Sequence, residues 1–165
     1  MRILSIVLVA VSALFLSGCL KSTAGCTYKV NGTVASSSEE QAIVTYLTSN
    51  GLTATKHSSN MYYQILADGT GTASPSQCSA ILINYSGKLT NGTVFDSQTS
   101  QVFTLGTLIE GWKVGIPLIK KGGQIRLFIP PSLGYGSQDI KDNSGNVVIP
   151  GNSILIFDIT LTDFQ

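Results

Sequence analysis

The sequence has few of the residues from which metal sites and catalytic triads are built. It contains one histidine, His57, and three cysteines, none of them in a C-x-x-C pair. A zinc site made from cysteine and histidine is therefore not expected, and we predict neither a metal nor another cofactor. A Ser-His-Asp hydrolase is also disfavoured, because His57 lies in a polar connector and the chain has no G-x-S-x-G turn.

The sequence also has no large excess of charge of one sign. The ten Lys and Arg residues include Arg2, and without it nine basic residues balance nine acidic ones (10 − 1 = 9). A neutral chain has no field that would attract nucleic acid or anionic lipid, so we predict no nucleic-acid partner. Nothing in the sequence requires a state above the monomer.

No apolar run reaches the roughly 20 residues that a membrane-spanning helix needs. The longest follows Arg2 and occupies residues 3–16. A basic residue before a short apolar run is typical of a secretory signal peptide, which we place at residues 1–18.

The end of this run, Leu16-Ser17-Gly18-Cys19, resembles the bacterial lipobox. The alternative is an ordinary cleavage site with a chance cysteine. The resemblance implies that Cys19 carries lipid and that the protein is exported and anchored in a bacterial membrane, with its domain in the periplasm or at the cell surface. Leu20 stands where an inner-membrane retention aspartate would stand, which favours the outer membrane.

The two other cysteines, Cys26 and Cys78, form an even pair. In an oxidising export compartment such a pair predicts a disulfide, and closing so long a loop would contribute about 4 kcal/mol of stability. Two separate free thiols are the alternative.

Composition divides the chain into four parts: the signal peptide (1–18), a lipidated tether (19–35), an N-terminal helix with a lead-in strand (36–78), and the main domain (79–165). The 147 residues after the signal (165 − 18) fit one domain. The tether is rich in Ser, Thr, Gly and Lys without periodicity, so we expect it to be flexible and unpacked apart from its Cys26 anchor.

Hydrophobic spacing predicts two short helices. The first begins at Ser37-Ser38-Glu39-Glu40, where a serine cap is followed three residues later by glutamate, and it ends before Asn50-Gly51. The second spans residues 109–119 and is kept short by Pro117.

Strands are predicted at residues 61–66, 80–85, 102–105, 124–129 and 154–161, and the alternating apolar positions of the last two should face the core. The segment 130–153 is rich in glycine and proline, and we expect a long loop that carries binding.

Five pieces of sequence occur in a recognisable order. They are NYSG (84–87), NGTVFDS (91–97), LIEGW (108–112), IPPSLGYG (129–136) and VIPGNSILIFD (148–158). Together they resemble the FK506-binding-protein (FKBP) class of peptidyl-prolyl isomerases over about residues 80–164, and the lead-in MYYQILADGTG (61–71) is similar to that of exported bacterial members.

The resemblance implies an α+β fold in which a strongly twisted antiparallel β-sheet wraps around one short α-helix, here with an N-terminal helix extension. It also implies a proline pocket between helix and sheet, with catalytic positions and substrate-binding positions. The implied catalytic set is Tyr85, Asp96, Ile109 and Tyr135, and the implied substrate-binding set is Phe95, Phe103, Leu108, Trp112, Val148, Ile149 and Phe157. Taken one at a time, Trp112 and Phe157 could equally be core residues, and Tyr135 an ordinary turn tyrosine.

The chemistry explains why such a pocket needs no nucleophile. Isomerisation only rotates a C–N bond whose resonance barrier is about 18–20 kcal/mol. Water stabilises the planar, charge-separated amide, so an apolar cavity favours the twisted form in relative terms. The resemblance assigns hydrogen bonds to that form to the Ile109 backbone N–H and the Tyr135 hydroxyl, while Asp96 orients neighbours such as Tyr85.

The implied partners are proline-containing polypeptide clients that fold after export, and macrolide inhibitors. The stretch 97–101 lacks the arginine and the additional aromatic residue that the family often has there, so we expect a more open pocket. The alternative function is a chaperone or assembly lipoprotein that holds proline segments in the same pocket without catalysis.

Overall fold

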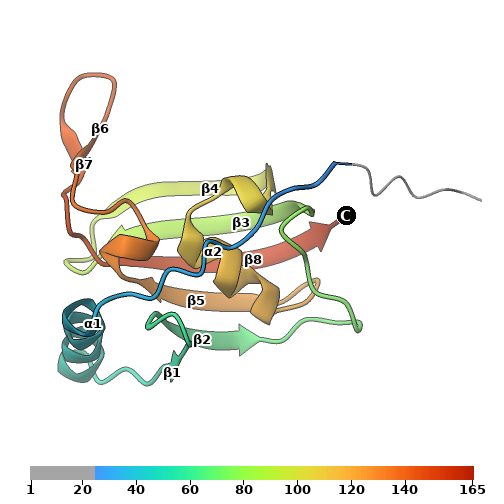
Figure 1. Cartoon of the computed structure of the whole chain (residues 1–165), viewed down its shortest axis with the longest axis horizontal. Helices are drawn as coiled ribbons and strands as arrows, with labels where there is room; N and C mark the ends of the chain where they lie inside the picture. Colours follow the sequence, from blue (N-terminus) through green and yellow to red (C-terminus); the bar gives the residue numbers. More distant parts are fainter. Residues whose placement is uncertain (1–24) are drawn as a thin grey trace, which may run out of the picture.

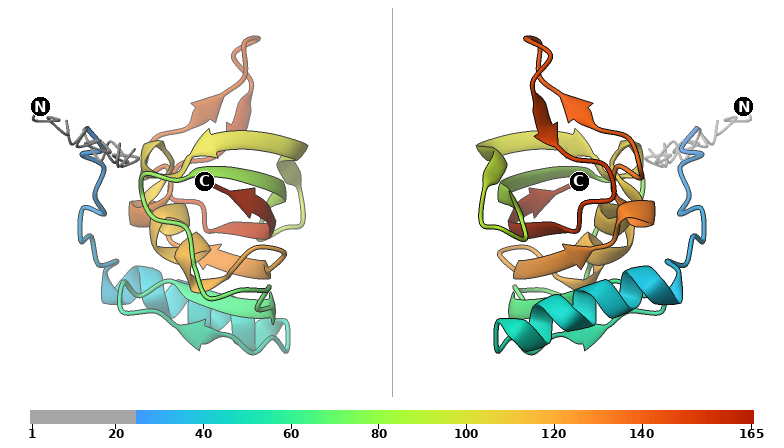
Figure 2. Two further views of the ribbon diagram at one scale, coloured as in Figure 1. Left: turned by 90° about the vertical axis from the view of Figure 1, so that its right-hand side faces the viewer. Right: turned by 90° about the vertical axis from the view of Figure 1, so that its left-hand side faces the viewer.

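A six-stranded antiparallel sheet organises residues 25–165, the part of the chain that the computed structural model describes. The predicted signal peptide and Cys19 lie outside these residues. The strand order is β1-β2-β5-β8-β3-β4, and the sheet curls around a short helix (Figures 1 and 2). The bounds are β1 Thr55–Lys56, β2 Tyr62–Ala67, β3 Ala80–Leu89, β4 Val94–Thr104, β5 Gln124–Ile129 and β8 Leu155–Phe164.

The short helix α2 (Glu110–Gly115) lies on the concave face of the sheet. It continues as the 3-10 turn η2 (Ile116–Leu118), because Pro117 has no N–H to extend an α-helical ladder. Gly111 and Gly115 let α2 approach β5 closely: a Cβ on either glycine would stand within 2.7 Å of Ile129 or Leu127 side-chain atoms. The main core lies between α2 and the sheet, and the predicted inward-facing residues of β5 and β8 are buried in it.

The N-terminal helix α1 (Ser37–Ser49) packs on the opposite face of the sheet. Its cap is Ser36 rather than the expected Ser37, and the reciprocal bond comes from Glu39, so the capping box starts one residue earlier than the sequence suggested. Ile43 and Leu47 bury against Phe128 and Ile156. Strands β5 and β8 are therefore apolar on both faces.

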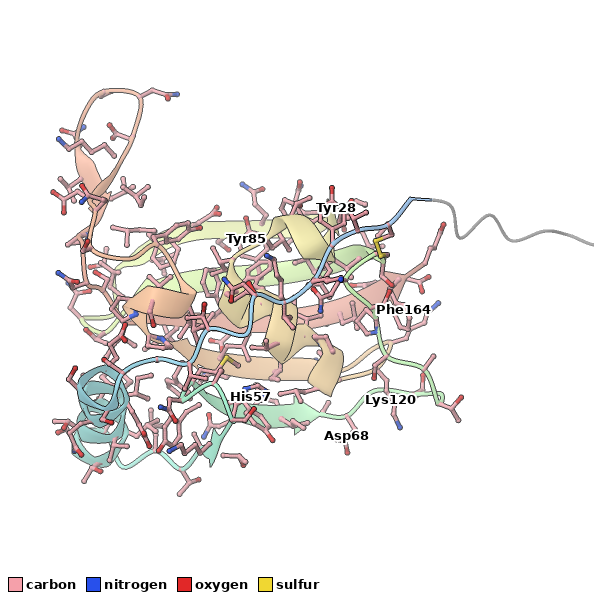
Figure 3. The ribbon with its side chains drawn as sticks, viewed as in Figure 1. Tyr28, His57, Asp68, Tyr85, Lys120 and Phe164 are labelled. Carbon is pink, nitrogen blue, oxygen red and sulfur yellow. A yellow bond between two sulfur atoms is a disulfide. The ribbon has the colours of Figure 1, made fainter. Side chains whose placement is uncertain are left out.

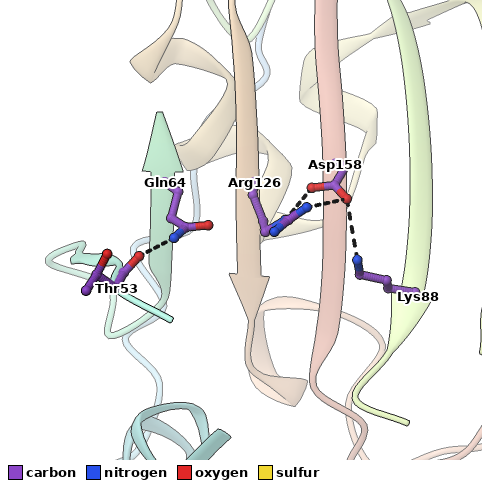
Figure 4. Close-up of polar contacts among 5 residues, drawn as sticks. All are labelled: Thr53, Gln64, Lys88, Arg126 and Asp158. Atoms are coloured by element: carbon purple, nitrogen blue, oxygen red, sulfur yellow. Dashed lines mark hydrogen bonds and ion pairs between the residues drawn. The ribbon is translucent and has the colours of Figure 1, made fainter. Parts of the chain in front are cut away.

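The rest of this outer face is polar. Arg126 on β5 stands opposite Asp158 on β8, and its Nη2 donates to Asp158 Oδ2 at 3.0 Å (Figure 4). Lys88 on β3 lies 3.6 Å from the same carboxylate, and Gln64 on β2 donates to the Thr53 carbonyl. Such cross-strand pairs stabilise a solvated sheet face without apolar burial.

Strand β4 is longer than the predicted 102–105. It begins at Val94, runs through the polar stretch 97–101 and ends at Thr104, where the 3-10 turn η1 (Leu105–Thr107) follows. The sequence signal was weak because β4 is an edge strand whose side chains are mostly exposed. A bulge interrupts it, and Ser100 there has φ 55° while its N–H donates to Asn84 Oδ1.

Residues 130–153 are not the plain loop that we expected. They contain the 3-10 turn η3 (Pro131–Leu133) and a two-stranded sheet of β6 (Ile140–Lys141) and β7 (Val147–Ile149). This hairpin projects from the body (Figures 1 and 2). Asp142 closes its tip by accepting the backbone N–H groups of Ser144 and Asn146.

The segment 26–35 forms a strap along the outer side of α2 (Figure 2). Cys26 is bonded to Cys78 at one end, where Figure 3 shows the disulfide near Tyr28 and Phe164. At the other end Ala35 is 3% exposed. Between them the Asn31 N–H donates to Glu110, a buried carboxylate of α2. The strap is therefore held at Cys26, Asn31 and Ala35 although most of its side chains are exposed, where its composition suggested a flexible tether with Cys26 as its anchor.

Candidate active site

A cavity of about 290 Å³ opens on the concave face of the sheet, beside α2. Most of the predicted catalytic and substrate-binding residues come together in its wall, although they lie on β3, β4, α2, β8 and the turns between them. Its lining residues are Tyr85, Asp96, Phe103, Thr107, Leu108, Ile109, Trp112, Tyr135 and Phe157.

Trp112 lies at the base of this cavity. The indole is 5% exposed and meets two neighbouring rings edge-on, with centroids 5.1 Å from Tyr85 and 5.0 Å from Phe157. Edge-to-face contacts of this kind are favourable beyond the area that they bury. The floor of the cavity is therefore a rigid aromatic cluster contributed by α2, β3 and β8.

Tyr85 links the floor to the polar rim. Its hydroxyl donates to Asp96 Oδ2 at 2.7 Å. Burial and the hydrogen bond to the Asp96 carboxylate raise the pKa of Tyr85 far above its ordinary value. Tyr85 therefore keeps its proton and holds the Asp96 carboxylate in a fixed orientation at the cavity edge.

Ile109 precedes α2 with an extended backbone, φ −60° and ψ 152°. The first N–H groups of a helix have no partner inside the helix. No acceptor within residues 25–165 pairs with the Ile109 amide, and the residue lines the cavity. The Ile109 N–H is therefore a free donor at the pocket.

Tyr135 is the second polar group at the mouth. It follows η3 in the segment between Gly134 and Gly136, and its side chain is 42% exposed. Burial of part of the ring, together with the Asp96 charge, raises the pKa of the Tyr135 hydroxyl. Like Tyr85, it keeps its proton at neutral pH and can donate a hydrogen bond.

Three predicted residues, Phe95, Val148 and Ile149, are not in the cavity wall. The Phe95 ring packs edge-on against Phe157 with centroids 5.5 Å apart. Ile149 is 4% exposed within the core, and Val148 is half-buried against it. Phe95 therefore supports the wall through Phe157, and Val148 and Ile149 belong to the core. The exposed Thr107 of η1 does line the cavity, although its polar side chain gave no reason to select it.

The arrangement suits binding and rotation rather than bond cleavage. Residues 25–165 hold no group of three or more acidic, histidine or cysteine side chains that could bind a metal ion. In the same residues, no helix is both long and apolar enough to cross a membrane. What the cavity offers is an aromatic floor, an apolar wall and two donors at its mouth.

Comparisons with known proteins agree with this geometry. Residues 71–162 match the family model described as FKBP-type peptidyl-prolyl cis-trans isomerase. Over 114 residues the chain is 44% identical to the FKBP-type peptidyl-prolyl cis-trans isomerase FkpA of Buchnera aphidicola subsp. Schizaphis graminum, which covers 67% of this chain and 43% of that protein. Over 112 residues it is 38% identical to FkpA of Escherichia coli K12, covering 66% and 39%.

Two crystal structures are similar to much of this fold. That of Escherichia coli FkpA has a TM-score of 0.64 and 33% identity, covering 78% of this chain and 58% of that one. That of AtFKBP13 has a TM-score of 0.62 and 31% identity, covering 68% and 99%.

The chain spans less than half the length of the two curated relatives, 43% and 39%, but nearly all of AtFKBP13, 99%. The matched segment contains β3, β4, α2 and β5, most of β8, and every residue of the cavity wall. The chain therefore belongs to the FKBP-type peptidyl-prolyl cis-trans isomerase family.

Proposed function

We propose that this protein catalyses cis–trans isomerisation of X-Pro bonds in polypeptides that fold after export. The observation that carries the proposal is the combination of an aromatic cavity with two donors at its mouth, the Ile109 N–H and the Tyr135 hydroxyl, neither of which has a partner among residues 25–165. Proline isomerisation takes tens to hundreds of seconds without a catalyst, so an accelerating pocket would matter to a folding chain.

The proposed mechanism uses desolvation and differential hydrogen bonding. A pyrrolidine ring would rest on Trp112, and the preceding amide would leave water for the wall of Phe103 and Phe157. Loss of hydration weakens the planar form, whose charge separation water stabilises. Only contacts that are stronger in the twisted form accelerate the reaction further.

The two donors have complementary parts in this scheme. The Ile109 N–H would bind the carbonyl that leaves the amide plane, and the Tyr135 hydroxyl would bind a second carbonyl of the substrate. Asp96 would act by orientation, since Tyr85 already holds one of its oxygens at 2.7 Å. No proton is exchanged in any of these steps.

A peptide assay tests this proposal. Isomerisation of an Ala-Ala-Pro-Phe peptide is followed with the wild-type chain and with Tyr135→Phe, which removes only the hydroxyl. Tyr62→Phe is the matched control, because the Tyr62 hydroxyl bonds Glu40 on the α1 side, away from the cavity. We expect Tyr135→Phe to lower kcat/KM about tenfold, as for loss of one good hydrogen bond, and Tyr62→Phe to leave it unchanged.

The same assay decides between catalysis and holding. A chaperone that only binds proline segments would retain the peptide without increasing its isomerisation rate above the thermal rate. Acceleration by the wild-type chain, and its loss with a macrolide competitor, would support the enzyme.

We also propose that the mature protein is a lipoprotein anchored through Cys19, with the outer membrane as the favoured site. The support is the Leu16-Ser17-Gly18-Cys19 sequence after a signal-like run. Expression in a bacterial host with labelled palmitate should label the wild-type protein and not Cys19→Ser. Equal labelling of both proteins would contradict the lipid anchor at Cys19. That result would not bear on the isomerase proposal, which rests on the pocket alone.

A further inference from the structure

A residue of α1 holds the turn that carries Tyr135. The Glu39 carboxylate accepts two hydrogen bonds from Ser132 in η3: the backbone N–H bonds Oε1 at 2.8 Å, and the hydroxyl bonds Oε2 at 3.1 Å. Glu39 and Ser132 are 93 residues apart in sequence. The contact therefore ties the N-terminal helix to the mouth of the pocket.

One carboxylate caps two helical segments here. Glu39 Oε2 also accepts the N–H and the hydroxyl of Ser36, both at 2.9 Å, which completes the capping box of α1. In η3, Pro131 has no N–H, so the Ser132 amide is the first donor that needs a partner. Partial burial alone would raise the pKa of Glu39, but the hydrogen bonds from Ser36 and Ser132 outweigh it and lower that pKa.

Tyr135 depends on this turn more than the floor residues do. Trp112 and Phe157 are 5% and 3% exposed and pack against each other, whereas Tyr135 is 42% exposed. Within residues 25–165 its hydroxyl has no hydrogen-bond partner. A side chain with so little packing is placed mainly by its backbone, and that backbone is fixed by η3, where the Gly136 N–H donates to the Pro131 carbonyl at 2.8 Å.

We propose that Glu39 is a positioning residue of the active site, which places the Tyr135 hydroxyl at the pocket mouth by fixing η3 through Ser132. This inference rests on the proposed isomerase function. Helix α1 lies outside the residues 71–162 that match the family model, so the contact makes a segment beyond that match part of the catalytic unit.

The neighbouring glutamate supplies a matched control. Glu40 lies in the same turn of α1, but its carboxylate pairs with Lys56 at 2.7 Å and with the Tyr62 hydroxyl at 3.1 Å. Replacing Glu39 or Glu40 with alanine therefore removes the same group from the same helix, and only Glu39→Ala releases η3. Thermal unfolding of both variants establishes that each is folded at the assay temperature.

The activity readout is isomerisation of an Ala-Ala-Pro-Phe peptide. We expect Glu39→Ala to lower kcat/KM about three- to tenfold, mainly through kcat, and Glu40→Ala to change it by less than about twofold. The milder Glu39→Gln, which keeps the size of the side chain, should fall between them. Equal activities of the two alanine variants would overturn the inference.

A double-mutant cycle tests whether Glu39 acts through Tyr135. If it does, Tyr135→Phe should lower kcat/KM less in the Glu39→Ala background than in the wild type, because the hydroxyl is already displaced. Equal effects in both backgrounds would contradict the inference.

Failure of the proposed function is distinguishable from failure of this inference. If the wild-type chain gives no acceleration, the isomerase proposal fails. The cycle is then repeated on binding of the same peptide, followed by the fluorescence of Trp112, the single tryptophan of the chain. Non-additive loss of affinity would still support positioning by Glu39, and additive loss would refute it.

Discussion

Reduction of the Cys26–Cys78 disulfide should destabilise the protein by an amount that follows from the length of the loop that the bond closes. The bond joins residues 52 positions apart. In the chain-entropy description a closed loop of this length stabilises the folded state by about 4 kcal/mol at 25 °C. Most of the strap side chains from Cys26 to Val34 are exposed, so the strap can also gain freedom in the reduced folded state, which lowers the expected loss to between about 2 and 4 kcal/mol.

Urea unfolding with and without reductant measures this loss. With a slope of about 2 kcal/mol/M, the midpoint should move down by between about 1 and 2 M. A Cys26→Ser, Cys78→Ser variant is the control: it should start at the lower midpoint and not respond to reductant. An unchanged wild-type midpoint on full reduction would contradict this expected loss, because it would show that the bond does not restrict the unfolded chain.

Three further outcomes are expected from other parts of the structure. Gly87→Ala should cost about 1–3 kcal/mol in thermal unfolding, because its Cβ would stand 2.6 Å from atoms of the Phe95 and Phe157 rings; a cost equal to that of the neighbouring Ser86→Ala would contradict this packing. Because Tyr85 and Tyr135 both have raised pKa values and keep their protons, isomerase activity should not decline between about pH 7 and 9, and a fall with a midpoint in that range would show that another group titrates. Folding lowers the pKa of Glu39 from 4.5, so the Glu39 carboxylate stabilises the folded protein above pH 4.5 and loses this effect as the pH falls through its folded pKa. The stability of Glu39→Gln should therefore fall less steeply in acid than that of the wild type. Equal slopes would contradict the lowered pKa.

Strong periodicity made the core elements predictable. The alternating apolar residues of β5 gave its bounds, and the spacing around Trp112 gave the helix under the sheet. The edge strand β4 and the hairpin β6–β7 were missed or shortened, because exposed polar residues carry no apolar alternation and their pairing depends on neighbours far away in sequence.

The pocket could be assembled from motifs, but its supports could not. Phe95 and Ile149 were placed in the wall by resemblance, but Phe95 packs on Phe157 outside the cavity lining and Ile149 lies in the core. The contact between Glu39 and Ser132 had no sequence signal beyond a capping box, because a carboxylate that caps its own helix gives no indication of a second segment 93 residues away. The attachment of the strap to α2 gave no sequence signal either, because it is made by the Asn31 N–H and the Glu110 carboxylate, which are 79 residues apart.

The most direct test of the account is the isomerisation rate of a prolyl peptide with the wild-type chain, measured with and without an FK506-type macrolide. We expect acceleration above the thermal rate, complete loss of that acceleration when one macrolide occupies the cavity, and a parallel change in Trp112 fluorescence. Acceleration that persists while the fluorescence shows an occupied cavity would mean that the reaction takes place elsewhere on the molecule.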